Sequence, residues 1–470
     1  MAETDICFLT ARELADRLRT REVSAREVVQ AHLTRVEQVN NRVNAVVTHT
    51  AESALKAAAA ADERLAAGKE VGPLHGIPMA HKDTHETAGV RTTYGSPLLA
   101  DYVPEADELL VERLRAAGVI TIGKTNVPEF AAGSHTFNPV FGHTHNPYDL
   151  TRSAGGSSGG AAAALACGMH PLADGSDMGG SLRNPASFCN VVGFRPSPGR
   201  VPDWPRPMGW ATMGVKGPMA RTVADAALLL SVLAGPDPRD PTSLETPGSV
   251  FAQPLDADPR GLRVAWSPDL GGGLPVDPAV AAVVERAAHT FEDDLGCRVE
   301  RDCVDFSGAD EVFRTLRAWS FAQTHAQHRD QLKDTLRQNV EEGLRLSGVD
   351  IARAEVLHTT LFHRVREFFE RYDILLLPVS QVPPFAAELE YPDSVDGVPM
   401  EDYLGWMRSA YFVSATGSPA LSVPGGFTAA GLPVGVQLVG AHRAELSVLR
   451  AGHAFEQATR FARRRPGILA

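Results

Sequence analysis

The sequence predicts an α/β protein whose sheet is largely internal. Its 470 residues are enough for a deep core, and 44% hydrophobic with 22% charged residues are ordinary values for a globular protein. From residue 72 to about 230, short apolar runs broken by Gly and Pro alternate with helical stretches, which is typical of buried strands in an α/β domain. Because no repeat or linker interrupts this pattern, we expect one domain over residues 1–470.

The first 70 residues are expected to be helical and to cover a face of the larger remainder of the domain. Thr10 with Glu13, and Ser24 with Glu27, both fit the capping box that begins a helix. The alanine-rich run at 51–67 indicates a further helix, which a glycine ends.

Later segments continue the alternation of strand and helix. Strands are expected at 262–266, 297–304 and 374–377. An amphipathic helix is expected at 277–295, and the charged stretch 305–372 is helix-rich. Residues 418–440 have the pattern of two strands joined by a turn, before a helix at about 445–459.

Charge, cysteine content and the pattern of apolar runs exclude several classes of protein. With 45 Lys and Arg against 57 Asp and Glu, the net charge of −12 argues against a nucleic acid as the main partner. The five cysteines form no CxxC pair, so neither a disulfide framework nor a zinc ribbon is indicated. The N-terminus lacks the pattern of a signal peptide, and no apolar run approaches the ~18 residues that a membrane span needs. We therefore expect a soluble, cytoplasmic protein that binds no membrane.

Glycines gather around two serines in the middle of the chain. Nine of the 42 glycines fall between residues 155 and 193, where Ser157 lies in GGSSGG and Ser181 in GGS. Glycine allows positive φ and lets backbone N–H groups approach a ligand closely, so both hydroxyls are expected on tight turns. The block has neither the phosphate-loop pattern GxxxxGK[ST] nor GxGxxG, and Ser181 does not lie in the GxSxG of a lipase-type elbow.

The block, GGSSGGAAAALACG followed by DGSDMGGSLRNPASFCNVVGFRPSPGRV, resembles the signature of the amidase signature family of serine hydrolases. Further segments resemble the same family, namely GIPMAHKDTHETAGVRTTYGS at 76–96, VITIGKTNVPEF at 119–130, GPMARTVADAALLL at 217–230 and SPALSVPGGFTAAGLPVGVQLVG at 418–440. The resemblance spans about residues 10–460 and is densest over 72–230, whereas about 300–410 matches no motif that we can name. It implies an α/β/α sandwich, with a large mixed β-sheet covered by helices.

The resemblance also implies a Ser/cisSer/Lys triad. Ser181 matches the nucleophile, Ser157 the serine that follows a cis peptide, and Lys82 in HKDT the base. Amide hydrolysis needs a nucleophile, a proton carrier and a site for the developing oxyanion. Because a base must be neutral, Lys82 needs an apolar environment that lowers its pKa from the usual ~10.4.

The segment before the nucleophile is expected to supply the oxyanion hole. Its donors would be the backbone N–H groups of Met178, Gly179, Gly180 and Ser181. Asp177 and Arg183 flank it and match common family positions, so we assign them to holding the loop rather than to proton transfer.

Other residues near the signature have competing interpretations. Lys124 in GKTN is a second candidate base, although its position favours a role in packing the loop that follows a strand. His81 departs from the aliphatic residue that the family usually has before its lysine, and it either faces the site or points away. Histidines are dense at 75–145 but lack the HExxH spacing of a metal site, so we expect neither metal nor cofactor.

Aromatic residues close in sequence to the signature are candidates for a substrate pocket. Phe137, Trp204 and Trp210 either line an apolar pocket for an aryl or alkyl group or pack in the core. The sequence of the segment 203–214 differs from the one that the family usually has there, so we expect this segment to influence substrate preference.

The leading hypothesis is a stand-alone amidase for small carboxamides, with anilides, esters or carbamates (a urethanase activity) open as alternatives. Its partner would be a small molecule, and the chain a monomer or homodimer. A rival is the glutamine-hydrolysing component of a tRNA-dependent amidotransferase, known as its A subunit. That component generally has NMDEF at 126–130, where this chain has NVPEF, and Gln at the position of Asn184. A silent scaffold is disfavoured because all three triad positions are filled.

Overall fold

A mixed sheet of eight strands forms the centre of the computed structural model, which describes residues 6–469. The strands are β8 (Leu172–Asp177), β9 (Val192–Arg195), β10 (Val215–Ala220), β11 (Arg263–Trp266), β12 (Arg298–Arg301), β13 (Ile374–Pro378), β16 (Ala420–Phe427) and β17 (Pro433–Val439). Their order is β12-β11-β13-β17-β16-β9-β10-β8. Strand β11 is parallel to both of its neighbours, and the other adjacent pairs are antiparallel.

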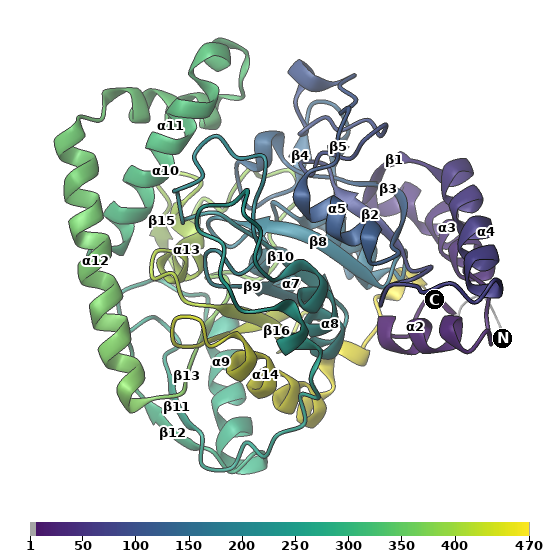
Figure 1. Cartoon of the computed structure of the whole chain (residues 1–470). Coiled ribbons are helices and arrows are strands. Elements are labelled where there is room, and N and C mark those ends of the chain that lie inside the picture. Colours follow the sequence, from purple (N-terminus) through teal and green to yellow (C-terminus); the bar gives the residue numbers. More distant parts are fainter. Residues whose placement is uncertain (1–5, 470) are drawn as a thin grey trace.

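Helices cover both faces of this sheet, as Figure 1 shows. Leu421 of β16 lies against Gly452 of one helix, whereas Ser422, which the pleat turns to the other face, lies near Ser187 of another. The first face carries α8 (Val223–Leu233), α9 (Pro278–His289) and α14 (Glu445–Thr459), and the second carries α6 (Gly159–Ala166), α7 (Arg183–Phe188) and α13 (Arg408–Ser414). The predicted α/β/α sandwich with a large mixed sheet is confirmed.

A second sheet places the lysine of the signature beside the first. It consists of β1 (Val46–His49), β3 (Ile120–Thr125) and β2 (Pro78–Lys82), in the order β1-β3-β2. Strand β2 runs parallel to β3 and packs beside β8 of the large sheet. Lys82, the last residue of β2, therefore lies next to the strand that leads into the second serine.

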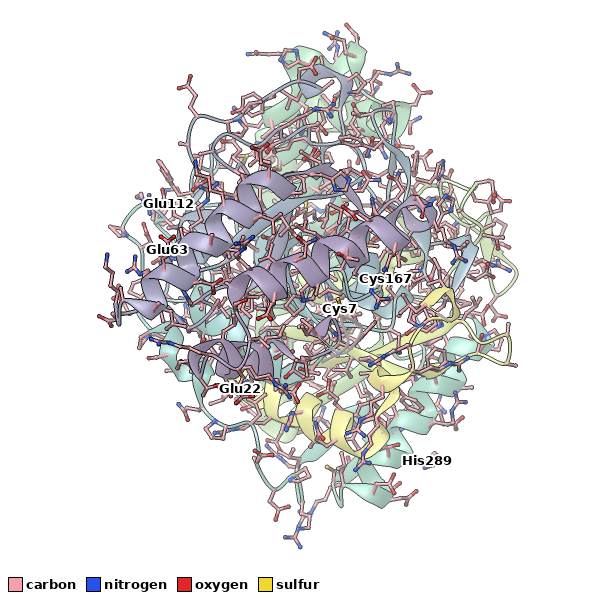
Figure 2. The ribbon with its side chains drawn as sticks, turned by 90° about the vertical axis from the view of Figure 1, so that its right-hand side faces the viewer. Cys7, Glu22, Glu63, Glu112, Cys167 and His289 are labelled. Atoms are coloured by element: carbon pink, nitrogen blue, oxygen red, sulfur yellow. The ribbon has the colours of Figure 1, made fainter. Side chains whose placement is uncertain are left out.

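The N-terminal region consists of α2 (Ala11–Arg19), α3 (Ala25–Val43) and α4 (Ala51–Ala66), and both predicted capping boxes are present. The expectation of helix throughout this region is wrong at β1, because Val46, Val47 and Thr48 are β-branched, and Val46, Thr48 and His49 pair with β3. Seen from the side of these helices, the buried thiols Cys7 and Cys167 lie near the middle of the view, and Glu63 lies toward its margin (Figure 2).

The region from about 300 to 410 adds an outer group of helices. These are α10 (Ala309–His325), α11 (Asp334–Arg345) and α12 (Gly348–Arg371), drawn in green on the side of Figure 1 opposite α2, α3 and α4. The remaining regular elements are α5 (Leu109–Ala116) and the short strands β4 (Phe137–Asn138), β5 (Gly142–His143), β6 (His145–Asn146), β7 (Asp149–Ser153), β14 (Ser394–Val395) and β15 (Val398–Pro399). Within residues 6–469, none of the helices has both the length and the apolar character that crossing a bilayer requires.

Candidate active site

Lys82 places a buried amine among three hydroxyl groups. Its side chain is fully buried, and Nζ lies 2.8 Å from Ser157 Oγ, 2.9 Å from Ser158 Oγ and 3.0 Å from Ser176 Oγ. A charged ammonium can only donate hydrogen bonds, so it would use all three hydroxyls as acceptors. A neutral amine has two N–H groups and one lone pair, so it would donate to two of them and accept a proton from the third. The arrangement thus satisfies either protonation state.

The environment favours the neutral amine. Burial lowers the pKa of Lys82 to about 7, although the negative charges of Asp177 and Asp174 act in the opposite direction. A lysine with this pKa is partly neutral near pH 7, whereas an exposed lysine is charged.

The loops that carry the two signature serines lie against each other. The peptide bond between Gly156 and Ser157 is cis, as the family resemblance implies. The backbone N–H of Ser158 donates to the carbonyl oxygen of Ser181 at 3.2 Å. Ser157 and Ser181 both line one cavity of about 280 Å³, and Ser181 is 8% exposed.

The segment from Met178 to Ser181 follows the carboxyl end of β8. Met178, Gly179 and Ser181 line the cavity. The N–H of Gly180 instead donates to Asp177 Oδ1 at 2.9 Å, and Gly180 has a φ of +111°. Of the four predicted donors, Gly180 therefore already has an acceptor within its own loop.

Asp177 and Arg183 form a fully buried pair beneath this loop. Arg183 Nε donates to Asp177 Oδ2 and Nη2 donates to Oδ1, both at 2.9 Å, and neither side chain is exposed to solvent. Burial alone would raise the pKa of Asp177, but the charges of Arg183 and Arg195 hold it well below its usual value. Arg183 also donates to the carbonyl oxygen of Ala410, so the loop is anchored to α13.

The walls of the cavity come largely from residues outside the signature motifs, although Asp203, Arg206 and Gly214 belong to the segment 203–214 that we expected to influence substrate preference. Helix α10 contributes Phe313, Arg317, Ser320 and Phe321. Other walls are formed by Thr84, His85, Phe130, Ala131, Gly133, Ser176, Asp203, Arg206, Gly214, Val215, Lys216 and Met407. No motif marks α10, so only the fold reveals that it faces the serines. Ser176 lies five residues before Ser181. This proximity was the only indication in the sequence that Ser176 belongs to the site.

The predicted aromatic pocket residues are distributed differently. Phe137 does not line the cavity, because its ring stacks on His143 with centroids 5.3 Å apart. Trp204 does not line it either, and its ring lies under the guanidinium of Arg239, 4.7 Å from the centroid. Trp210 is 79% exposed and lines a neighbouring hollow of about 520 Å³ that shares Met178 with the cavity.

The two open questions about basic residues have clear geometric answers. His81 points away from the serines, with Nδ1 2.6 Å from Asp174 Oδ2 and Nε2 3.0 Å from Thr121 Oγ1. Lys124 is also buried, and burial lowers its pKa to about 8. Its amine donates to Thr87 Oγ1 at 2.9 Å and contacts neither signature serine. Across residues 6–469, no group of three or more His, Cys, Asp or Glu side chains is arranged to hold a metal ion.

Comparison with known proteins shows the family to which the chain belongs. The family model described as Amidase matches residues 27–449. The crystal structure of a bacterial aryl acylamidase of the amidase signature enzymes superposes with a TM-score of 0.90 at 31% identity, covering 97% of this chain and 98% of that one. The chain belongs to the amidase signature family.

The similar proteins within the amidase signature family are named for two different activities. An acylamidase of Rhodococcus erythropolis is 37% identical over 473 residues, which cover 99% of this chain and 98% of the relative. The A subunit of the glutamyl-tRNA(Gln) amidotransferase of Moorella thermoacetica is 39% identical over 493 residues, which cover 99% of each chain. Sequence identity alone thus does not choose between these two kinds of amidase signature protein.

Proposed function

We propose that this chain is a stand-alone amidase that hydrolyses the C–N bond of small carboxamides. The observation that carries the proposal is the buried amine of Lys82, with a pKa of about 7, 2.8 Å from the hydroxyl of Ser157 at the cavity that Ser181 also lines. A nucleophile, a proton relay and a partly apolar cavity are the parts that acyl transfer requires.

In the first half of the reaction, Ser181 Oγ attacks the carbonyl carbon of the amide. The Ser181 proton passes to Ser157 Oγ, while the Ser157 proton passes to the neutral amine of Lys82. Collapse of the tetrahedral intermediate breaks the C–N bond, and Ser157 gives a proton to the leaving amine as Lys82 returns its own to Ser157. The products of this half are the free amine and an ester of Ser181.

In the second half, water attacks the ester carbonyl and passes a proton through Ser157 to Lys82. The bond to Ser181 Oγ then breaks, the proton returns to that oxygen, and the carboxylic acid leaves. Since this route needs only an acyl carbonyl and a leaving group, the proposal extends to anilides, esters and carbamates.

The oxyanion is assigned to the backbone N–H groups of Met178, Gly179 and Ser181, which border the cavity. Gly180, whose N–H bonds Asp177, fixes the shape of the loop in this scheme. One such donor typically lowers the barrier by about 3 kcal/mol. The position of each N–H group relative to the oxyanion therefore matters for the rate.

The glutamine-hydrolysing component of an amidotransferase is a second candidate, because the Moorella relative with that name is 39% identical. Two sequence positions weigh against it, namely 126–130, which read NVPEF, and Asn184. The two functions differ in what the purified chain does alone: a stand-alone amidase needs no partner protein to release an amine.

The experiment is turnover of a panel of aryl and aliphatic amides, anilides, esters and carbamates by the purified chain. We expect amine release without any partner, and activity that appears only with amidotransferase partners would overturn the proposal. Ser181→Ala should abolish both turnover and labelling by a fluorophosphonate. The matched control is Ser231→Ala, because that hydroxyl bonds only the carbonyl oxygen of Leu228 on α8. Labelling that persists in Ser181→Ala would place the nucleophile elsewhere.

A further inference from the structure

Arg317 brings an arginine side chain into the wall of the serine cavity. On α10, Phe313, Arg317, Ser320 and Phe321 all line the cavity, and their spacing of four, three and one residues puts them on one helix face. Arg317 lies in the middle of this face and is 5% exposed.

The side chains in direct contact with this guanidinium are uncharged. Nη1 donates to the side-chain oxygen of Asn339. The ring centroid of Phe321 is 4.0 Å from Cζ, and that of Tyr403 is 5.4 Å away. Over residues 6–469, no carboxylate oxygen lies within 4.0 Å of a side-chain nitrogen of Arg317, so Arg317 forms no ion pair there.

The other cations of the same cavity have carboxylate partners. Lys216 Nζ lies 2.7 Å from Asp203 and 2.9 Å from Glu108. Arg206 Nε lies 3.8 Å from Asp203. Among the described residues, Arg317 therefore differs from them in having no carboxylate within ion-pair distance.

An arginine remains charged in proteins, and burying a charge without a counterion is costly. Because Arg317 borders the cavity, a bound molecule can reach it. We infer that the amide hydrolysed here also carries a carboxylate, and that Arg317 binds this carboxylate. The inference rests on the proposed amidase function and names the substrate class for the same site.

The position of Arg317 sets the length of such a substrate. Phe313 packs on the segment from Met178 to Ser181, to which the oxyanion is assigned and which we call the oxyanion loop, so closely that a Cβ on Gly179 would lie 2.8 Å from Phe313 Cζ. Arg317 follows four residues later, which is about 6 Å along the helix. A carboxylate bound there lies a few bonds from the scissile carbonyl, as in the monoamide of a short dicarboxylic acid or an acylated aminobenzoate. The guanidinium fork is suited to such a planar group.

The test compares anionic and neutral amides of matched shape. On the acyl side, the pair is the mono-4-nitroanilide of glutaric acid and the 4-nitroanilide of pentanoic acid. On the amine side, the pair is 4-acetamidobenzoate and 4-acetamidotoluene. We expect kcat/KM to favour the anionic member of at least one pair by roughly 10- to 100-fold, mainly through KM. The pair that shows the preference identifies the end of the substrate that faces Arg317.

Substitutions then assign the preference to one side chain. Arg317→Met should reduce the ratio of the two kcat/KM values by the same roughly 10- to 100-fold, and Arg317→Lys should restore part of it. The matched control is Arg314→Met on the same helix, whose arginine pairs with Asp402 at 2.6 Å outside the cavity and should leave the ratio unchanged. Should Arg317→Met fail to fold, competitive inhibition of the wild type by glutarate but not by glutaramide tests whether the cavity binds a carboxylate, and the loss of this inhibition in Arg317→Gln, or its weakening in Arg317→Lys, assigns it to Arg317.

Two failures are distinguishable. If the neutral amides of the panel are hydrolysed but no anionic member is preferred, the carboxylate inference is overturned and the amidase proposal stands. If no member of the panel is hydrolysed by the chain alone, the proposed function itself is overturned.

Discussion

Asp174 Oδ1 accepts a hydrogen bond from the backbone N–H of Lys82 at 2.7 Å, while its Oδ2 lies 2.6 Å from His81 Nδ1. One buried carboxylate on β8 thus holds two successive residues of β2, whose side chains point to opposite faces. The position of the amine among the serines depends on this contact between the two sheets.

Asp174→Asn should therefore affect both stability and activity. Disturbing the hydrogen bonds of a buried carboxylate costs about 1–3 kcal/mol, which urea unfolding will measure. The charge of Asp174 also raises the pKa of Lys82, so its loss should move the acid limb of kcat/KM to lower pH.

In the wild type, contacts with His81 hold the pKa of Asp174 well below its usual value, despite burial. Stability from this carboxylate is present above about pH 4 and is lost as the pH falls below it. The exposed Asp330→Asn is the control, and an unfolding midpoint equal to its own would contradict the prediction.

The pH dependence of wild-type kcat/KM should have an acid limb near pH 7. Only neutral Lys82 can accept the proton, so the rate should fall about tenfold per unit as the pH drops below its pKa. Between about pH 7 and 10.4 the unfolded chain binds the extra proton, so this group's contribution to stability increases with pH. Lys82→Ala should lose activity near neutral pH. The limb should persist in Lys124→Met, and its disappearance there would make Lys124 the base instead.

Arg183→Met should unfold more easily by about 3–5 kcal/mol, because Asp177 loses its bidentate partner in a site without solvent. Arg183→Lys should fall between this variant and the wild type, since an ammonium cannot reproduce the two parallel hydrogen bonds. Thermal unfolding measures both, and Arg353→Met, which removes an exposed pair with Glu311, should be nearly neutral. Equal stabilities for all three variants would refute a structural role for the buried pair.

Gly180→Ala should lose kcat and stability together. Its φ is +111°, and an added Cβ would lie 2.6 Å from Ala410 Cβ and from Asn184 Nδ2. The loop must shift to accept the methyl group, which moves the oxyanion donors. Gly348→Ala is a suitable control, because nothing lies within 4 Å of the added atom. Steady-state kinetics and a melting curve check both effects, and wild-type kcat in Gly180→Ala would show that the loop tolerates the change.

Elements with strong local signals could be predicted from the sequence. The helix at about 445–459 and the strand at 374–377 agree with α14 and β13 to within a residue, because their apolar periodicity is continuous. Strand β1 was missed because four residues between two helices have little periodicity, and their pairing with β3 is tertiary.

The active-site prediction had a similar limit. Lys82, Ser157 and Ser181 could be proposed because they lie in contiguous motifs; in the structure the two serines line one cavity, and the buried Lys82 amine lies 2.8 Å from Ser157 Oγ. Phe313 and Arg317 could not be found, since their segment matches no motif and faces the serines only after α10 packs on the oxyanion loop.

The contacts of Arg183 join the loop beside Ser181 to residues that are synthesised much later. Its guanidinium donates to Ala410 O, Ser414 Oγ and Gln437 Oε1, which lie 227, 231 and 254 residues further along the chain. A nascent chain of 400 residues already contains the lysine and both serines, but it lacks every one of these acceptors. We therefore expect the loop beside Ser181 to reach its final shape only after the ribosome has released β17, so that unfinished chains contain the proposed catalytic residues without the activity.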